Sequence, residues 1–195
     1  GLPDTPFHLS LYLEELDARE DALAALRLAE IRAPGNRLIP YKIGRNYEEM
    51  GRLEEALTAY ESASVEDPES PYLYFNRGVI AYRQEDYEKA REEFETAAPK
   101  CEDVRLEAKC RYNIGNCQYR DARRQEDSDL QKALDACKLA IESYQDAVRL
   151  DPELVQAGRN LEVARLTMKS LLDAIKKKQE EQQKQQEQQQ KMMEE

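Results

Sequence analysis

The chain has 195 residues, of which 35% are charged and 41% apolar, with 7 Gly, 8 Pro and a net charge of −11. This composition is typical of a helical, water-soluble protein, and no run of about 18 apolar residues is present that could span a membrane. An acidic surface repels phosphate backbones, so we expect no nucleic-acid partner and favour a cationic or amphipathic peptide. No secretory leader opens the chain, although a leader or anchor removed upstream of Gly1 would leave no trace.

Residues of similar type recur at intervals of 34 positions. The matching sets are Ala22, Ala56 and Ala90; Ala29, Ala63 and Ala97; Leu26, Tyr60 and Phe94; Pro34 and Pro68; and Gly44 and Gly78. Because five sets share one period, the sequence predicts an internal repeat whose copies stack on their neighbours.

Two segments resemble the tetratricopeptide repeat: "YKIGRNYEEMGRLEEALTAYESASVEDP" at 41–68 and "FNRGVIAYRQEDYEKAREEFETAA" at 75–98. The resemblance implies an all-α superhelix (α-solenoid) of helix–turn–helix units, in which small residues let paired helices cross closely. The expected divisions are a degenerate first repeat at 3–36, a second at 37–70, a third at 71–102, an elongated fourth at 103–152, a capping helix at 153–178 and a Gln-rich tail at 179–195. The tail buries nothing, so it is either disordered or a solvated helix.

The interval from Ala90 to Ala140 is 50 residues, 16 more than the period, with three residues inserted between the third and fourth repeats and thirteen within the fourth hairpin. The thirteen form either a loop or an extension of both helices. The midpoint between Gly115 and Ala140 falls at 127–128, an Asp–Ser pair suited to a turn. The residues before it have a helix-forming composition without Gly or Pro, and the apolar residues after it have helical spacing. We therefore expect a helix over about 104–126 and a partner helix ending near 149, both packed on a third helix that reaches at least Ile175.

The motif "NLEVARL" at 160–166, in a long final helix followed by a Gln-rich tail, resembles the repeat proteins of bacterial Bat operons over about 109–190. That resemblance implies a role linked with aerotolerance and a place in the bacterial cell envelope, periplasmic or membrane-associated. It also implies a von Willebrand A domain as a partner. The D-x-S-x-S metal motif of such a domain is absent here, so the domain would lie outside this chain. A cytoplasmic location stays open.

Residue patterns for catalysis are missing. The four cysteines are spaced C-x8-C-x6-C-x19-C, which lacks the short pairs of a zinc site. Cys110 and Cys117 fit buried thiols, with a bridge between Cys117 and Cys137 as the second interpretation. His8 is the one histidine and no Gly-rich phosphate loop occurs. We expect a protein that is not an enzyme and carries no cofactor or metal.

The repeat resemblance places the first helix of each hairpin along a concave groove. The positions implied to line it, and so to bind a peptide, are Tyr41, Arg45, Tyr72, Phe75, Tyr82, Arg83, Tyr112, Asn116, Tyr119 and Arg120. Aromatic rings interleaved with Arg and Asn suit an extended or helical protein segment. The alternative is that several of the tyrosines only pack between repeats.

Two functions stay open. The first is an envelope scaffold for protein partners, and the second is a soluble co-chaperone-like adaptor that binds peptide tails. Chaperone-binding relatives hold a C-terminal carboxylate with Lys and Asn; Asn116 and Arg120 match two elements of that clamp, but Tyr112 stands where its Lys would be. The charged tip of the long hairpin is either a second contact surface or a solvated end.

Overall fold

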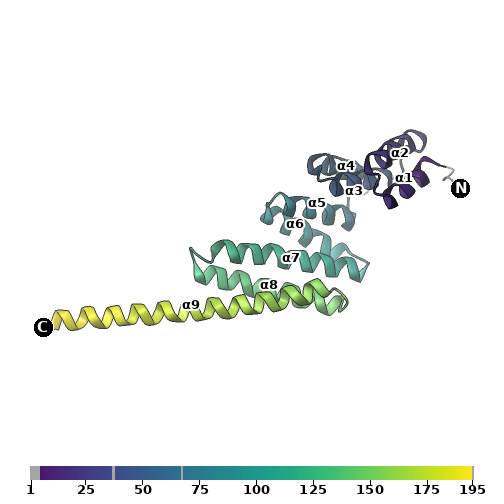
Figure 1. Ribbon diagram of the computed structural model, residues 1–195. Helices are drawn as coiled ribbons and strands as arrows, with labels where there is room; N and C mark the ends of the chain where they lie inside the picture. Colours follow the sequence, from purple (N-terminus) through teal and green to yellow (C-terminus); the bar gives the residue numbers. More distant parts are fainter. Residues whose placement is uncertain (1–4, 37, 67, 195) are drawn as a thin grey trace. The chain divides into compact units, whose positions relative to one another are not determined.

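The computed structural model describes residues 5–36, 38–66 and 68–194, without the side chains of 64–66 and 194. Within these ranges every regular element is a helix, which confirms the all-α class (Figure 1). Three boundaries of the predicted repeats and tail fall at residues 3, 37 and 195, which lie outside the described ranges.

The chain forms two compact units, Gly1–Lys100 and Cys101–Glu195. Unit 1 contains α1 (Pro6–Glu15), α2 (Arg19–Arg32), α3 (Leu38–Glu49), α4 (Leu53–Glu66), α5 (Pro71–Arg83), α6 (Tyr87–Ala97) and the short 3-10 helix η1 (Ala98–Lys100). Successive helices pack as the hairpins α1–α2, α3–α4 and α5–α6. The three residues inserted before the fourth repeat coincide with the region of η1.

The three hairpins of unit 1 turn in the same way. Asp17, Gly51 and Glu85, each 34 residues from the next, have φ angles of 57°, 74° and 63°. Only Gly takes this left-handed conformation without steric cost, so two of the three turns carry backbone strain.

Small residues allow the two helices of each hairpin to approach closely. A Cβ atom placed on Gly44 would lie 2.6 Å from the ring of Tyr60, and one on Gly78 would lie 2.7 Å from the ring of Phe94. Both rings are fully buried. These contacts between glycine and an aromatic ring therefore explain why both residue types recur every 34 positions.

Unit 2 is a hairpin of long helices covered by a third helix. Its elements are α7 (Val104–Gln125), α8 (Leu130–Leu150) and α9 (Val155–Glu194). α7 has 22 residues and α8 has 21, whereas α1 to α6 have 10 to 14. Asp129 caps α8 by accepting hydrogen bonds from the backbone N–H groups of Gln131 and Lys132. The predicted elongated hairpin, its turn and the long third helix are confirmed.

A second core holds unit 2 together. It is made by buried residues of α7, α8 and α9, including Ala122, Leu134, Tyr144, Leu161 and Leu171. The four cysteines are thiols: Cys110, Cys117 and Cys137 are buried, and Cys101 is partly exposed. The structure thus supports buried thiols rather than a Cys117–Cys137 bridge.

Candidate functional site

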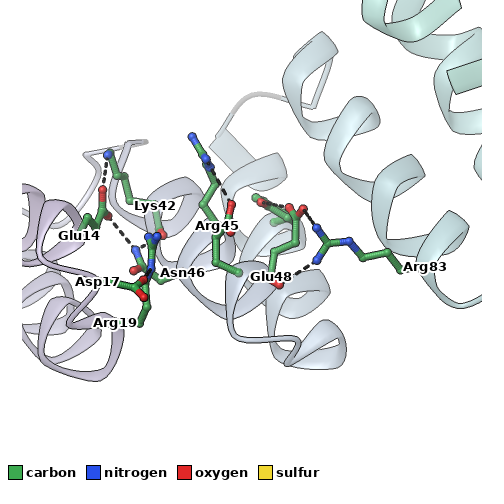
Figure 2. Close-up of polar contacts among 10 residues, drawn as sticks. Glu14, Asp17, Arg19, Lys42, Arg45, Asn46, Glu48 and Arg83 are labelled. Atoms are coloured by element: carbon green, nitrogen blue, oxygen red, sulfur yellow. Dashed lines mark hydrogen bonds and ion pairs between the residues drawn. The ribbon is translucent and has the colours of Figure 1, made fainter. Parts of the chain in front are cut away.

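A row of polar side chains joins the first helices of the hairpins in unit 1 (Figure 2). Glu14 of α1 accepts hydrogen bonds from Lys42 Nζ at 2.8 Å and Asn46 Nδ2 at 2.7 Å, both on α3. Glu48 of α3 forms an ion pair with Arg83 of α5 at 3.2 Å. These five residues are termed the polar row. Because each carboxylate is only slightly exposed and has partners, the row ties α1 to α3 and α3 to α5.

Arg83, a predicted peptide-binding residue, also donates from Nη1 to the backbone carbonyl of Glu48 at 2.9 Å, near the carboxyl end of α3. A cation there satisfies helix carbonyls that lack intrahelical partners. Tyr60 donates its hydroxyl proton to Glu48 Oε2 at 3.0 Å, and burial, followed by the nearby carboxylate, raises the pKa of Tyr60 well above its usual value. Tyr60 therefore stays a neutral donor.

Arg45 lies on α3 with its side chain about half exposed, and it pairs with Glu49 at 3.6 Å. A pair this exposed contributes little to stability. The guanidinium of Arg45 can therefore exchange this partner for a bound carboxylate or carbonyl group at small cost.

Two of the five predicted tyrosines, Tyr41 and Tyr72, line a pocket in unit 1 with a volume of about 590 Å³. Its described lining residues are Gly35, Asn36, Leu38, Tyr41, Ala63, Ser70, Tyr72 and Leu73. It is termed the tyrosine pocket. Tyr41 packs against the core, with its ring centroid 5.9 Å from that of Tyr60, whereas Tyr72 is 46% exposed and Leu38 is 58% exposed. The pocket thus has a fixed wall formed by Tyr41 and an accessible rim formed by Tyr72 and Leu38.

Phe75 and Tyr82, both on α5, pack within their own hairpin. The ring centroid of Phe75 lies 5.6 Å from that of Phe94, and the centroid of Tyr82 lies 5.2 Å from that of Tyr87 in an edge-to-face arrangement. Both side chains remain partly exposed. They combine a packing role with an accessible surface.

The predicted residues of unit 2 contact α8 and α9. Asn116 Oδ1 accepts hydrogen bonds from Tyr144 Oη and Asn160 Nδ2, each at 2.9 Å. Tyr119 Oη lies 2.9 Å from Thr167 Oγ1 of α9, and the ring centroid of Tyr112 lies 6.0 Å from that of Tyr144. These three side chains thus help to join the helices of unit 2. Arg120 is exposed on α7.

Sequence reasoning missed four members of the polar row: Glu14, Lys42, Asn46 and Glu48. A signal was available, because Glu14 and Glu48 are 34 residues apart and so occupy the same position in successive repeats. It also missed Asn76 of α5, whose buried Nδ2 has no hydrogen-bond partner within the described ranges.

Glu93 of α6 is the one buried acidic residue in the described part of the chain. Burial raises its pKa, and the ion pair with Arg77 of α5 at 2.7 Å opposes that rise. This pair connects the two helices of one hairpin. Among the described residues no three His, Cys, Asp or Glu side chains are grouped to hold a metal ion. No described helix is long and apolar enough to cross a membrane.

Comparison with known proteins agrees with this arrangement of hairpins. The sequence profile of the tetratricopeptide repeat family matches residues 41–104. A crystal structure of MamA protein aligns over 92% of this chain and 91% of its own, with 17% identity and a TM-score of 0.65. MamA residues 41 to the end, from Desulfovibrio magneticus RS-1, align over 94% and 98%, with 18% identity and a TM-score of 0.65. The tetratricopeptide repeat fold predicted from the sequence is confirmed.

A third similar structure holds a peptide. The first tetratricopeptide domain of Spaghetti (RPAP3), bound to the HSP90 peptide SRMEEVD, aligns over 68% of this chain and 92% of its own, with 20% identity and a TM-score of 0.55. No curated protein sequence matches the chain. At these identities the likeness concerns the fold.

Proposed function

We propose that this protein is a non-catalytic scaffold that binds a segment of a partner protein on unit 1, with an apolar side chain of that segment anchored in the tyrosine pocket. The observation that carries the proposal is the pocket itself, which brings together Tyr41 and Tyr72 from successive repeats. Its volume falls in the range typical of ligand sites, and aromatic residues are common anchors at protein interfaces.

Charge favours a basic partner segment. Residues 1–100 contain twelve Lys and Arg against twenty-one Asp and Glu, a net charge of −9, whereas residues 101–195 contain seventeen against nineteen, a net charge of −2. An acidic unit attracts cationic segments and raises their association rate, most strongly at low salt. The proposed ligand is therefore a segment with one large apolar residue flanked by Lys or Arg.

Three other predicted residues of unit 1 extend this site. Arg45, Phe75 and Tyr82 offer exposed or partly exposed surface on α3 and α5 for contacts outside the pocket. In unit 2, the hydrogen bonds and ring contacts of Tyr112, Asn116 and Tyr119 favour a packing role. We therefore place the main binding surface on unit 1.

A displayed library of random peptides, selected on the immobilised full chain, tests the proposal. We expect selected peptides to carry an aromatic or aliphatic residue beside basic residues. Titration calorimetry should then show at least a tenfold loss of affinity for Tyr72→Ala combined with Leu38→Ala, which is about 1.4 kcal/mol. Ile31→Ala is the matched control, because Ile31 is also in unit 1 and is 78% exposed but does not line the pocket. Equal losses in both variants would refute the pocket as the anchor.

We further propose that the scaffold works in a bacterial cell-envelope complex of the Bat type, linked with aerotolerance, with a von Willebrand A domain protein as a partner. The support is the resemblance of "NLEVARL" and the Gln-rich tail to that group. Cross-linking in cells followed by membrane fractionation tests it: recovery of the chain with a von Willebrand A domain protein is expected. Recovery from the cytosol with chaperones alone would refute the envelope role.

The alternative is a soluble adaptor that binds the tails of chaperones, and the observation that favours it is the likeness to the peptide-bound Spaghetti domain. The peptide SRMEEVD distinguishes the two functions. If the full chain binds this peptide and loses it when the carboxyl terminus is amidated, the adaptor is correct. We expect no binding, because the peptide is acidic and unit 1 is strongly acidic.

A further inference from the structure

Helix α9 continues well beyond the core of unit 2 (Figure 1). Its last residues packed on that core are Met168, Leu171 and Ile175. All side chains from 176 to 193 are exposed. Residues 176–194, termed the tail helix, extend about 28 Å at 1.5 Å per residue. Apart from Met192 and Met193 the tail helix is polar, and it does not pack on the cores formed by the described residues, so its stability requires a reason.

Five of the nine charged residues in the tail helix recur at intervals of seven residues. Lys occurs at 177, 184 and 191, and Glu occurs at 180 and 187, three residues after the first two of these lysines. Positions seven apart lie on one side of an α-helix, so these residues form a single charged stripe. The stripe leaves the opposite side of the helix almost without charge.

The uncharged side continues the line of residues that α9 buries in unit 2. The spacing of three and four residues runs through Leu161, Ala164, Met168, Leu171 and Ile175, and on through Lys178, Gln182, Gln185, Gln189 and Met192. The first five residues are buried or partly buried against the core. The last five are exposed, with Met192 at 70%. One seam thus runs the length of α9, and its second half has no partner within the described residues.

We propose that the second half of this seam pairs with the same segment of a second copy of the chain, forming a short antiparallel coiled coil lined by glutamine. Antiparallel pairing about a two-fold axis between residues 183 and 184 places Gln182 against Gln185 of the other copy, and Lys178 against Gln189. It also brings Met192 beside Ile175 of the other copy. The seam therefore matches itself, with apolar contacts at both ends.

Charge favours a second copy as the partner. Residues 176–195 contain five Lys and five Glu, so two tails do not repel each other. The rest of the chain carries the whole net charge of −11, and antiparallel pairing places the cores of unit 2 from the two copies at opposite ends of the coil. Lys178 is the one charged residue in this half of the seam, and its long side chain can reach solvent.

The packing of unit 2 favours the antiparallel direction. Before Ile175 the seam is already covered by α8, where Cys137 Sγ donates to the carbonyl of Ala164 at 3.2 Å. A parallel partner would have to continue along this covered part of α9. In the antiparallel arrangement residues 175–192 of one copy pair with residues 175–192 of the other, so the part of α9 that α8 covers takes no part in the pairing.

Polar residues in a coiled-coil seam reduce stability while fixing register. The dimer is therefore weak, and sedimentation equilibrium of the full chain over a wide concentration range is the suitable measurement. We expect the average mass to rise from 22.6 kDa toward twice that value as concentration increases. A mass that stays at the monomer value throughout would overturn the proposal and leave the tail as a single solvated helix.

Two double variants test the seam. Gln182→Glu with Gln185→Glu places carboxylates opposite one another in the centre of the coil, and we expect at least a tenfold loss of association. Gln183→Glu with Gln190→Glu adds the same charge outside the seam, and we expect it to associate like the wild type. Equal association of the two variants would refute the seam. The melting temperature of the two units should be the same in both double variants, since the tail helix lies outside the core of unit 2.

Direction is tested by disulfide trapping, with Cys101→Ser in every variant. A mixture of chains with Gln182→Cys and chains with Gln185→Cys should give mostly mixed dimers on mild oxidation with oxidised glutathione, because positions 182 and 185 face each other. Two chains lose two thiol hydrogens and gain one S–S bond, and the glutathione disulfide is reduced. Predominance of like-with-like dimers would mean parallel pairing and would overturn the antiparallel arrangement.

Discussion

Substitution of Gly115 by Ala tests whether the close helix crossings hold the repeats together. A Cβ atom on Gly115 would lie 2.7 Å from both Cδ1 and Cε1 of the Tyr144 ring. That ring is fully buried, and its hydroxyl is held by Asn116 at 2.9 Å. The ring cannot move away without disturbing the core or this hydrogen bond.

The expected magnitude follows from three contributions. Overpacking of a core costs about 1–3 kcal/mol, and loss of the Tyr144 hydrogen bond adds about 1 kcal/mol. Replacing Gly by Ala inside a helix returns about 1 kcal/mol. We therefore expect Gly115→Ala to lower the free energy of unfolding by about 2 kcal/mol.

Gly158→Ala is the matched control. Gly158 lies in α9 of the same unit, and a Cβ atom there would meet nothing within 4 Å. This variant should gain about 1 kcal/mol from helix propensity alone. Urea denaturation followed by circular dichroism measures both changes, with the slopes compared because a repeat array can depart from two-state unfolding. If Gly115→Ala is stabilised as much as Gly158→Ala, the close crossing has no energetic role and the reasoning fails.

Three further predictions follow from the geometry. Glu85→Gly should raise the free energy of unfolding by about 1 kcal/mol, because Glu85 has a φ of 63°, a conformation that Gly adopts without steric cost. Glu88→Gly, within α6, should lower the free energy of unfolding by about as much, and urea titration distinguishes the two variants. Under native conditions at neutral pH, Cys101 should react with a thiol reagent faster than the three buried cysteines, and all four should react in denaturant. Burial raises the pKa of Cys101 as well as those of Cys110 and Cys137, so access of the reagent decides the order. The hydrogen bond from the backbone N–H of Lys132 holds the pKa of Asp129 below its usual value, so the unfolded chain binds a proton at Asp129 more tightly than the folded chain. The stability that this cap gives should be lost as pH falls below about 3.9. The melting temperature of Asp129→Asn should therefore depend less on pH in that range.

The sequence by itself determined the hairpins and their lengths. Gly44 and Gly78, one period apart, mark the crossings, and the length of the insert together with the Asp127–Ser128 turn predicted the long α7–α8 hairpin. These features are local, since helix periodicity, capping residues and small residues act within one or two turns of the chain. For the tail the sequence left a disordered segment and a solvated helix both open.

The composition of the candidate site was decided by tertiary structure. All ten predicted residues lie on the first helix of a hairpin and were expected to line one groove. In the structure, Tyr41 and Tyr72 line a pocket, whereas Asn116 and Tyr119 form hydrogen bonds with α8 and α9. Nothing in the spacing of these residues distinguishes the two outcomes. The difference depends on which neighbouring helix covers each side chain, and hydrogen bonds such as that from Asn160 to Asn116 join residues far apart in sequence. Repeat periodicity places a side chain on a face, but only packing between helices decides whether that face stays open to a partner.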